Sequence, residues 1–214
     1  MSYTTAKDFW KDLKQYPSYP NIKERRLIDV NFIVSNSSGS NSVIDLGCGD
    51  GYLLIALREF TEITKFYGYD ISEKLLQQLV YRWGKTKGLK ADVCDFVEVA
   101  KFPKTDLTVS MGMFPYIFNV DDLESIIDAV TSDTFIVRVP CTGKEEDEYI
   151  DTYSKDLNAN YSSIYRTKEN YLSILKKFYK EVNVERSYSD DIESKYGTKH
   201  YFFVCKEKLL WKEL

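Results

Sequence analysis

The stretch VIDLGCGDG at residues 43–51 largely decides how this chain of 214 residues is expected to fold. Val43 to Leu46 form a short segment with β-branched residues that is typical of a strand, and the apolar residues between Tyr52 and Phe60 indicate a helix. The three glycines in between let the backbone turn tightly and approach a ligand, and the start of a helix presents unpaired N–H groups. The stretch therefore predicts a strand, a ligand-binding loop and a helix in succession.

Strand and helix patterns alternate along the rest of the chain. Further strands are expected near residues 66–70, 89–93, 107–111, 135–139, 182–188 and 200–206, and further helices over 73–83, 120–130 and 167–179. Such alternation indicates a parallel sheet with helices on both faces. The last two strands are joined by a polar loop and are expected as an antiparallel pair that closes one edge. The sequence therefore predicts an α/β fold with seven mostly parallel strands.

Two acidic residues end the strands that follow the glycine loop. Asp70 ends the second strand, where a carboxylate can accept both hydroxyl protons of a ribose. The structural alternative is that Asp70 caps the next helix, but Ser72 can provide that cap alone. Asp92 lies near the end of the third strand, where a carboxylate can bond an adenine amino group. A dinucleotide-binding loop would need a glycine at position 52, and Tyr52 disfavours NAD.

The glycine loop and the two acids, in this strand order, resemble the class I S-adenosylmethionine-dependent methyltransferase family, of the type that acts on small molecules. The resemblance runs from about Val43 to Val139 and more loosely to Lys206. It implies a Rossmann-like fold, S-adenosylmethionine as the cofactor, and methyl transfer to an oxygen or nitrogen atom. A non-catalytic regulatory subunit that binds the same cofactor, or an NAD-dependent enzyme, remains as an alternative.

The resemblance also implies which residues bind the cofactor. They are Asp45, Gly47, Cys48, Gly49, Gly51, Asp70, Ile71, Asp92, Val93, Ser110 and Met111. The glycines would line the methionine end, with Asp45 anchoring their loop. Asp70 would hold the ribose hydroxyls, and Asp92 would address the adenine amino group. Ser110 and Met111 would pass near the sulfonium.

Residues 1–42 precede the first strand and are expected to form a helical lid. Aromatic residues recur there at helical spacing, and Tyr16 and Tyr19 are candidates for substrate binding. Residues 43–140 would form the cofactor-binding core, and residues 141–214 would supply substrate-side helices and closing strands. We expect all three parts to form a single methyltransferase domain.

Four further residues are candidates for chemistry or substrate binding. His200, the single histidine, and Tyr116 are the catalytic candidates, because a histidine facing the site can act as a base near neutral pH. Arg138 lies in the fifth strand, where a charge is costly unless it is paired or opens onto a site. An arginine fork suits a carboxylate or phosphate, so Arg138 and Arg166 suggest an anionic small substrate. A structural ion pair at Arg138 is the alternative.

The composition disfavours several other classes of protein. The net charge is −4 and the pI is near 5.2, opposite to the basic character that favours nucleic acid. No stretch approaches the ~20 apolar residues of a membrane-spanning helix. Four scattered cysteines without CxxC spacing predict neither a disulfide framework nor a metal site, and fit a cytoplasmic protein. A small molecule is the expected partner, and the sequence does not distinguish a monomer from a homodimer.

Overall fold

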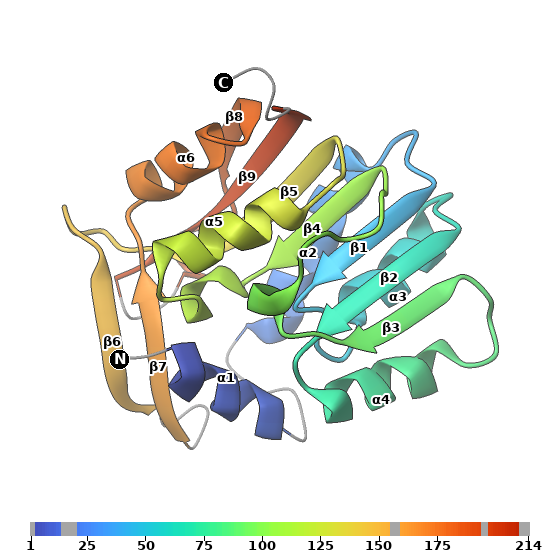
Figure 1. Ribbon diagram of the computed structural model, residues 1–214, viewed down its shortest axis with the longest axis horizontal. Helices are drawn as coiled ribbons and strands as arrows, with labels where there is room; N and C mark the ends of the chain where they lie inside the picture. The colour runs from blue at the N-terminus through green and yellow to red at the C-terminus, as the bar shows by residue number, and fades with distance from the viewer. Residues whose placement is uncertain (1–2, 14–20, 155–158, 194–196, 210–214) are drawn as a thin grey trace.

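A central sheet of seven strands organises the molecule (Figure 1). The computed structural model describes residues 3–13, 21–154, 159–193 and 197–209. The strands are β1 (Ser42–Leu46), β2 (Lys65–Asp70), β3 (Leu89–Val93), β4 (Leu107–Met111), β5 (Thr134–Cys141), β8 (Tyr179–Arg186) and β9 (Lys199–Lys208). Their spatial order is β3-β2-β1-β4-β5-β9-β8. Because β9 is antiparallel to both β5 and β8 while the other pairs are parallel, it alone runs against the rest.

Helices cover both faces of this sheet. One face is packed by α2 (Ile22–Asn36), α3 (Tyr52–Phe60) and α4 (Glu73–Trp83), and the other by α5 (Val120–Ala129) and α6 (Lys168–Lys176). Every residue of β1 and β4 is buried, as expected for strands covered on both faces. The predicted Rossmann-like sheet with helices on both faces is therefore confirmed, although α6 ends three residues earlier than expected.

A second, smaller layer lies beyond the carboxyl ends of the parallel strands. It consists of α1 (Tyr3–Asp12), the hairpin of β6 (Glu148–Ser154) and β7 (Ala159–Tyr165), and the 3-10 turns η1 (Phe96–Glu98) and η2 (Phe114–Tyr116). Figure 1 shows α1 beside β7, and Ala6 of α1 packs with Phe118 and Ile164. The sequence patterns did not predict this hairpin.

The two helices of the N-terminal segment, α1 and α2, lie in different places. Helix α2 belongs to the core, since Ile33 is fully buried and the ring of Phe32 stacks on Phe202 with centroids 3.8 Å apart. Tyr16 and Tyr19, predicted to bind substrate, lie outside the described residues. Among the helices that the structure describes, none is long and apolar enough to cross a membrane.

Candidate active site

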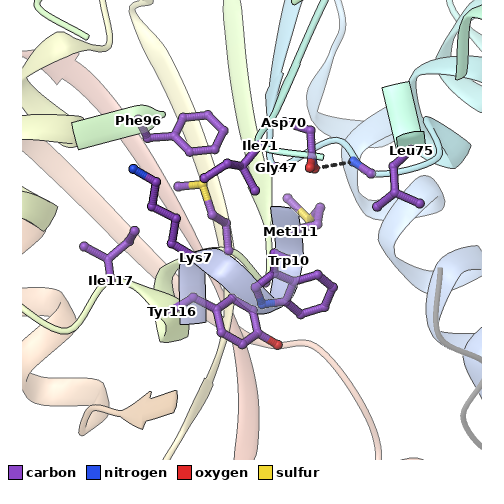
Figure 2. Close-up of a pocket in the computed structure, with 13 residues that line it drawn as sticks. Lys7, Trp10, Gly47, Asp70, Ile71, Leu75, Phe96, Met111, Tyr116 and Ile117 are labelled. Carbon is purple, nitrogen blue, oxygen red and sulfur yellow. Dashed lines mark hydrogen bonds between the residues drawn. The ribbon is translucent and has the colours of Figure 1, made fainter. Parts of the chain in front are cut away.

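A pocket lies at the carboxyl ends of β1, β2 and β4, between the glycine loop and α1 (Figure 2). It encloses about 610 Å³, part of it open to solvent. The thirteen residues that line it are Lys7, Trp10, Gly47, Gly49, Asp70, Ile71, Leu75, Phe96, Met111, Gly112, Met113, Tyr116 and Ile117. Five of the predicted cofactor-binding residues are therefore brought together: Gly47, Gly49, Asp70, Ile71 and Met111.

The glycine loop turns directly after β1. The N–H groups of Gly47 and Cys48 both donate to the carbonyl oxygen of Tyr69 on β2, at 2.8 and 3.1 Å, which fixes the turn against the neighbouring strand. Gly47 has a φ of 77°, a conformation that favours glycine, and a Cβ there would lie 3.0 Å from the Cβ of Met113. Gly51 is not among the residues that line the pocket, and a Cβ there would collide with Leu79 of α4.

Asp70 connects the glycine loop to the start of α4. Its Oδ2 accepts a hydrogen bond from the N–H of Gly49, and its Oδ1 accepts one from the N–H of Ser72, both at 2.8 Å. Burial raises the pKa of Asp70, and these backbone donors oppose the rise. Ser72 caps α4 by accepting a hydrogen bond from the N–H of Leu75, as predicted. A carboxylate has about four acceptor positions, so Asp70 keeps acceptor capacity for a ligand in the pocket.

Three predicted cofactor-binding residues support the loop from behind and are absent from the wall of the described pocket. Asp45 is buried, and its Oδ1 has no hydrogen-bond partner among the residues that the structure describes. Burial, with smaller contributions from nearby carboxylates, raises the pKa of Asp45 to about 8. Cys48 is buried in the core cluster beneath the loop, close to Gly68. Ser110 donates to the carbonyl oxygen of Leu46 at 3.1 Å, joining β4 to the end of β1.

Two arginines brace the loop at Asp50, a feature that the sequence reasoning missed. Arg26 on α2 places Nη2 3.1 Å from Oδ1 of Asp50, and Arg82 on α4 places Nη1 3.0 Å from Oδ2. Arg82 also donates to the carbonyl oxygen of Asp50. Local sequence patterns do not predict this contact, because tertiary packing brings α2 and α4 to the loop.

The predicted adenine contacts lie elsewhere than expected. Asp92 is half-exposed on the edge strand β3, with Oδ2 3.3 Å from Nζ of Lys90, and Val93 is 58% exposed. Neither residue lines the described pocket. That side of the wall is formed by Phe96, which is buried in the turn η1.

Helix α1 covers the opposite side of the pocket with Trp10 and Lys7. The rings of Trp10 and Tyr116 meet edge to face, with centroids 4.8 Å apart. Nζ of Lys7 forms an ion pair with Oδ2 of Asp95, next to Phe96. Tyr116, a predicted catalytic residue, is therefore on the pocket wall. The helical spacing of aromatic residues near Trp10 could have indicated its position on the pocket wall. The pairing of Lys7 with Asp95 could not be predicted from residue spacing.

Arg138 forms a largely buried ion pair, which is the structural alternative that the sequence left open. Its Nη2 lies 3.2 Å from Oδ2 of Asp29 on α2 and 3.3 Å from the carbonyl oxygen of Met111. Asp29 also accepts hydrogen bonds from the hydroxyls of Tyr52 at 3.0 Å and Tyr188 at 2.9 Å. The guanidinium thus lies behind the pocket wall, and its charge is balanced by Asp29.

His200 and Arg166 also differ from their predicted placement. His200 is buried beside the ring of Tyr188, and burial lowers the pKa of its imidazole well below the usual value. Arg166 is fully buried, and its Nη2 donates to the carbonyl oxygens of Ile117 and Phe118, both at 2.9 Å. Neither side chain is on the wall of the described pocket, because both are held within the core. Arg166 instead supports that wall from behind.

Comparisons with known proteins agree with this geometry. The model of a family described as a methyltransferase domain matches residues 37–187, and the chain belongs to this family. It is a class I S-adenosylmethionine-dependent methyltransferase. No sequence among curated proteins matches it.

Several solved structures share the fold. A putative S-adenosylmethionine-dependent methyltransferase from Listeria monocytogenes has a TM-score of 0.66 and 18% identity, over 86% of this chain and 99% of that one. A putative methyltransferase from Haloferax volcanii, solved in complex with the Trm112 activator, has a TM-score of 0.64 and 19% identity, over 87% and 93%. The N-terminal domain of EvdMO1 with S-adenosylhomocysteine bound has a TM-score of 0.69 and 10% identity, over 95% and 94%.

Proposed function

We propose that this chain transfers the methyl group of S-adenosylmethionine to an oxygen or nitrogen atom of a small molecule bound between the glycine loop and α1. The observation that carries the proposal is the continuity of one pocket from Gly47, Gly49 and Asp70 to Trp10 and Tyr116. One end of this pocket has the glycines and the acid that suit the methyl donor. The other end has an aromatic wall that suits an acceptor.

The residues at the donor end fit S-adenosylmethionine. Gly47 and Gly49 let the backbone approach the methionine part, and the acceptor capacity of Asp70 suits the ribose hydroxyls. Ile71 and Phe96 provide apolar walls for the adenine. Met111 would lie near the sulfonium, at the end of β4. The roles proposed for Asp92 and Val93 have no support from their positions on the exposed edge strand.

When bound, the donor supplies a methyl group made electrophilic by its sulfonium. A lone pair of the acceptor forms the new C–O or C–N bond as the C–S bond breaks, and that electron pair stays on sulfur to give S-adenosylhomocysteine. The proton of the acceptor is released to solvent or to a nearby base. The protein orients the two reactants, and α1 excludes water from them.

Tyr116 is the catalytic candidate whose position supports a role, since it lines the acceptor side of the pocket. Its hydroxyl would orient the acceptor atom by hydrogen bonding. His200 has no comparable support, because it is buried away from that wall and its lowered pKa keeps the imidazole neutral. The prediction of an anionic substrate likewise has no support from Arg138, because Asp29 balances the charge of its guanidinium.

Calorimetry with S-adenosylmethionine, S-adenosylhomocysteine and NAD tests the donor site. We expect binding of the first two and none of NAD. Incubation of a metabolite extract with methyl-labelled donor then tests transfer, and labelled small molecules are the expected product. Donor binding without any labelled product in such extracts would favour the alternative of a non-catalytic regulatory subunit.

A further inference from the structure

The charged groups on the pocket wall are already engaged by the protein. Of the thirteen lining residues, Lys7 and Asp70 are the two that carry a charge at neutral pH. Lys7 forms an ion pair with Asp95, and Asp70 accepts two backbone hydrogen bonds. The rest of the wall is made of aromatic, aliphatic, methionine and glycine residues. A charged acceptor molecule would therefore lose its hydration here without gaining a counterion, which is costly.

One polar group on this wall has no hydrogen-bond partner among the residues that the structure describes. Nε1 of Trp10 is buried and makes no hydrogen bond with the residues that the structure describes. Trp10 lines the acceptor side of the pocket, where its ring packs against Tyr116 (Figure 2). A buried N–H without an acceptor destabilises a protein, and a ligand atom that accepts its hydrogen bond removes that cost.

We infer that the methyl acceptor is an uncharged, mainly apolar molecule that packs against Trp10 and Tyr116 and accepts a hydrogen bond from Nε1 of Trp10. This inference rests on the proposed function, because it assigns the acceptor side of the same pocket. A planar molecule with a hydroxyl or neutral amine suits the edge-to-face ring pair. It replaces the anionic substrate that Arg138 suggested.

Matched phenols test the charge of the acceptor. Binding of 4-methylphenol and 2-naphthol would be compared with that of 4-hydroxybenzoate and 6-hydroxy-2-naphthoate, by calorimetry on protein saturated with S-adenosylhomocysteine near neutral pH. We expect each neutral phenol to bind at least about tenfold more tightly than its carboxylate, a difference of about 1.4 kcal/mol. Equal or tighter binding of the carboxylates overturns the inference. So does the failure of both neutral phenols to bind to protein that holds S-adenosylhomocysteine, whereas failure to bind S-adenosylhomocysteine itself counts against the proposed function.

Trp10→Phe tests the hydrogen bond, because phenylalanine keeps an aromatic ring and removes the N–H. We expect the variant to bind 4-methylphenol about two- to tenfold more weakly, while toluene, which lacks an acceptor atom, binds equally to both proteins. Trp83→Phe is the matched control, since Trp83 ends α4 away from the pocket and its N–H donates to the carbonyl oxygen of Thr86 in the loop that follows. An equal loss for both ligands, or no loss for 4-methylphenol in a folded variant, contradicts the assignment.

Discussion

Asp70 contacts both the glycine loop and the first turn of α4, so its carboxylate shapes the pocket as well as lining it. We predict that Asp70→Asn weakens the binding of S-adenosylhomocysteine by tenfold or more. The change removes a charge-assisted hydrogen bond, worth about 1.5–3 kcal/mol, and leaves the side-chain volume nearly unchanged. Calorimetry gives the affinity, and circular dichroism shows whether the variant folds.

Asp92→Asn provides the matched control for Asp70. The sequence predicted that both acids lie near strand ends, because strand patterns show where a strand ends. It does not fix which side of an edge strand meets a pocket, and Asp92 is half-exposed and paired with Lys90. We expect the affinity of Asp92→Asn for S-adenosylhomocysteine to stay within about twofold of wild type. A loss of affinity as large as that of Asp70→Asn would show that Asp92 contacts the cofactor.

Asp45 makes stability depend on pH in a direction opposite to that of a salt-bridged acid. Its pKa is about 8 in the folded chain, against 3.8 as the ordinary value, so the folded state keeps a proton that the unfolded state releases. Stability is therefore lost as pH rises from about 4 towards 8. Asp45→Asn lacks this titration.

We predict that the free energy of unfolding of Asp45→Asn, relative to wild type, rises by more than about 1.4 kcal/mol between about pH 5.5 and pH 7.5. Urea denaturation of both proteins at each pH gives the difference. Parallel pH profiles for the two proteins would show that the carboxyl is already ionised in the folded state.

At the scale of elements, the two N-terminal helices have different roles. Deleting residues 1–20 removes α1, which packs over the pocket, so we expect a folded protein that still binds S-adenosylhomocysteine but loses methyl transfer. Deleting residues 1–35 also removes Ile33 and Asp29 from the core, and we expect that chain to fail to fold. Circular dichroism and calorimetry separate the outcomes. Methyl transfer at the wild-type rate without α1 would rule out the covering role.

The ion pair between α2 and β5 gives a further prediction. Asp29→Ala removes the carboxylate of Asp29 from the largely buried guanidinium of Arg138, and breaking a buried pair costs about 3–5 kcal/mol. The double variant Asp29→Ala/Arg138→Met removes both charges, so we expect it to be more stable than Asp29→Ala alone. Urea denaturation measures both. A double variant that is less stable than Asp29→Ala would mean that Arg138 contributes through its contact with Met111 rather than through its charge.

The elements that sequence patterns predicted well are those buried on both sides. Strands such as β1 and β4 are short, mainly apolar segments, and the helices that cover them have amphipathic spacing. The β6–β7 hairpin was missed because it lies outside the main sheet and is largely exposed on one strand, with Tyr149 and Tyr153 facing solvent. Its polar and aromatic residues therefore do not alternate in the way that a half-buried strand requires.

For the whole molecule, the alternation of strands and helices and the position of the glycine loop predicted the architecture of the sheet. They did not predict the side-chain contacts that hold the pocket together. Strand polarity placed the glycine loop and Asp70 at one edge. The contacts of Arg26 with Asp50 and of Lys7 with Asp95 join residues 24 and 88 positions apart. Local spacing carries no information on such pairs, because tertiary packing alone brings them together.

The position of β9 also constrains when the molecule is able to fold during synthesis. β9 lies between β5 and β8, although both are translated before it. Until β9 leaves the ribosome, β5 has an open edge and β8 has no strand to pair with, and open edges invite association between chains. We predict that nascent chains stalled before residue 199 remain sensitive to protease, whereas chains with β9 fully emerged become resistant. The sheet would then be completed only after β9 has left the ribosome, and the unpaired edge of β5 would need protection in cells until that moment.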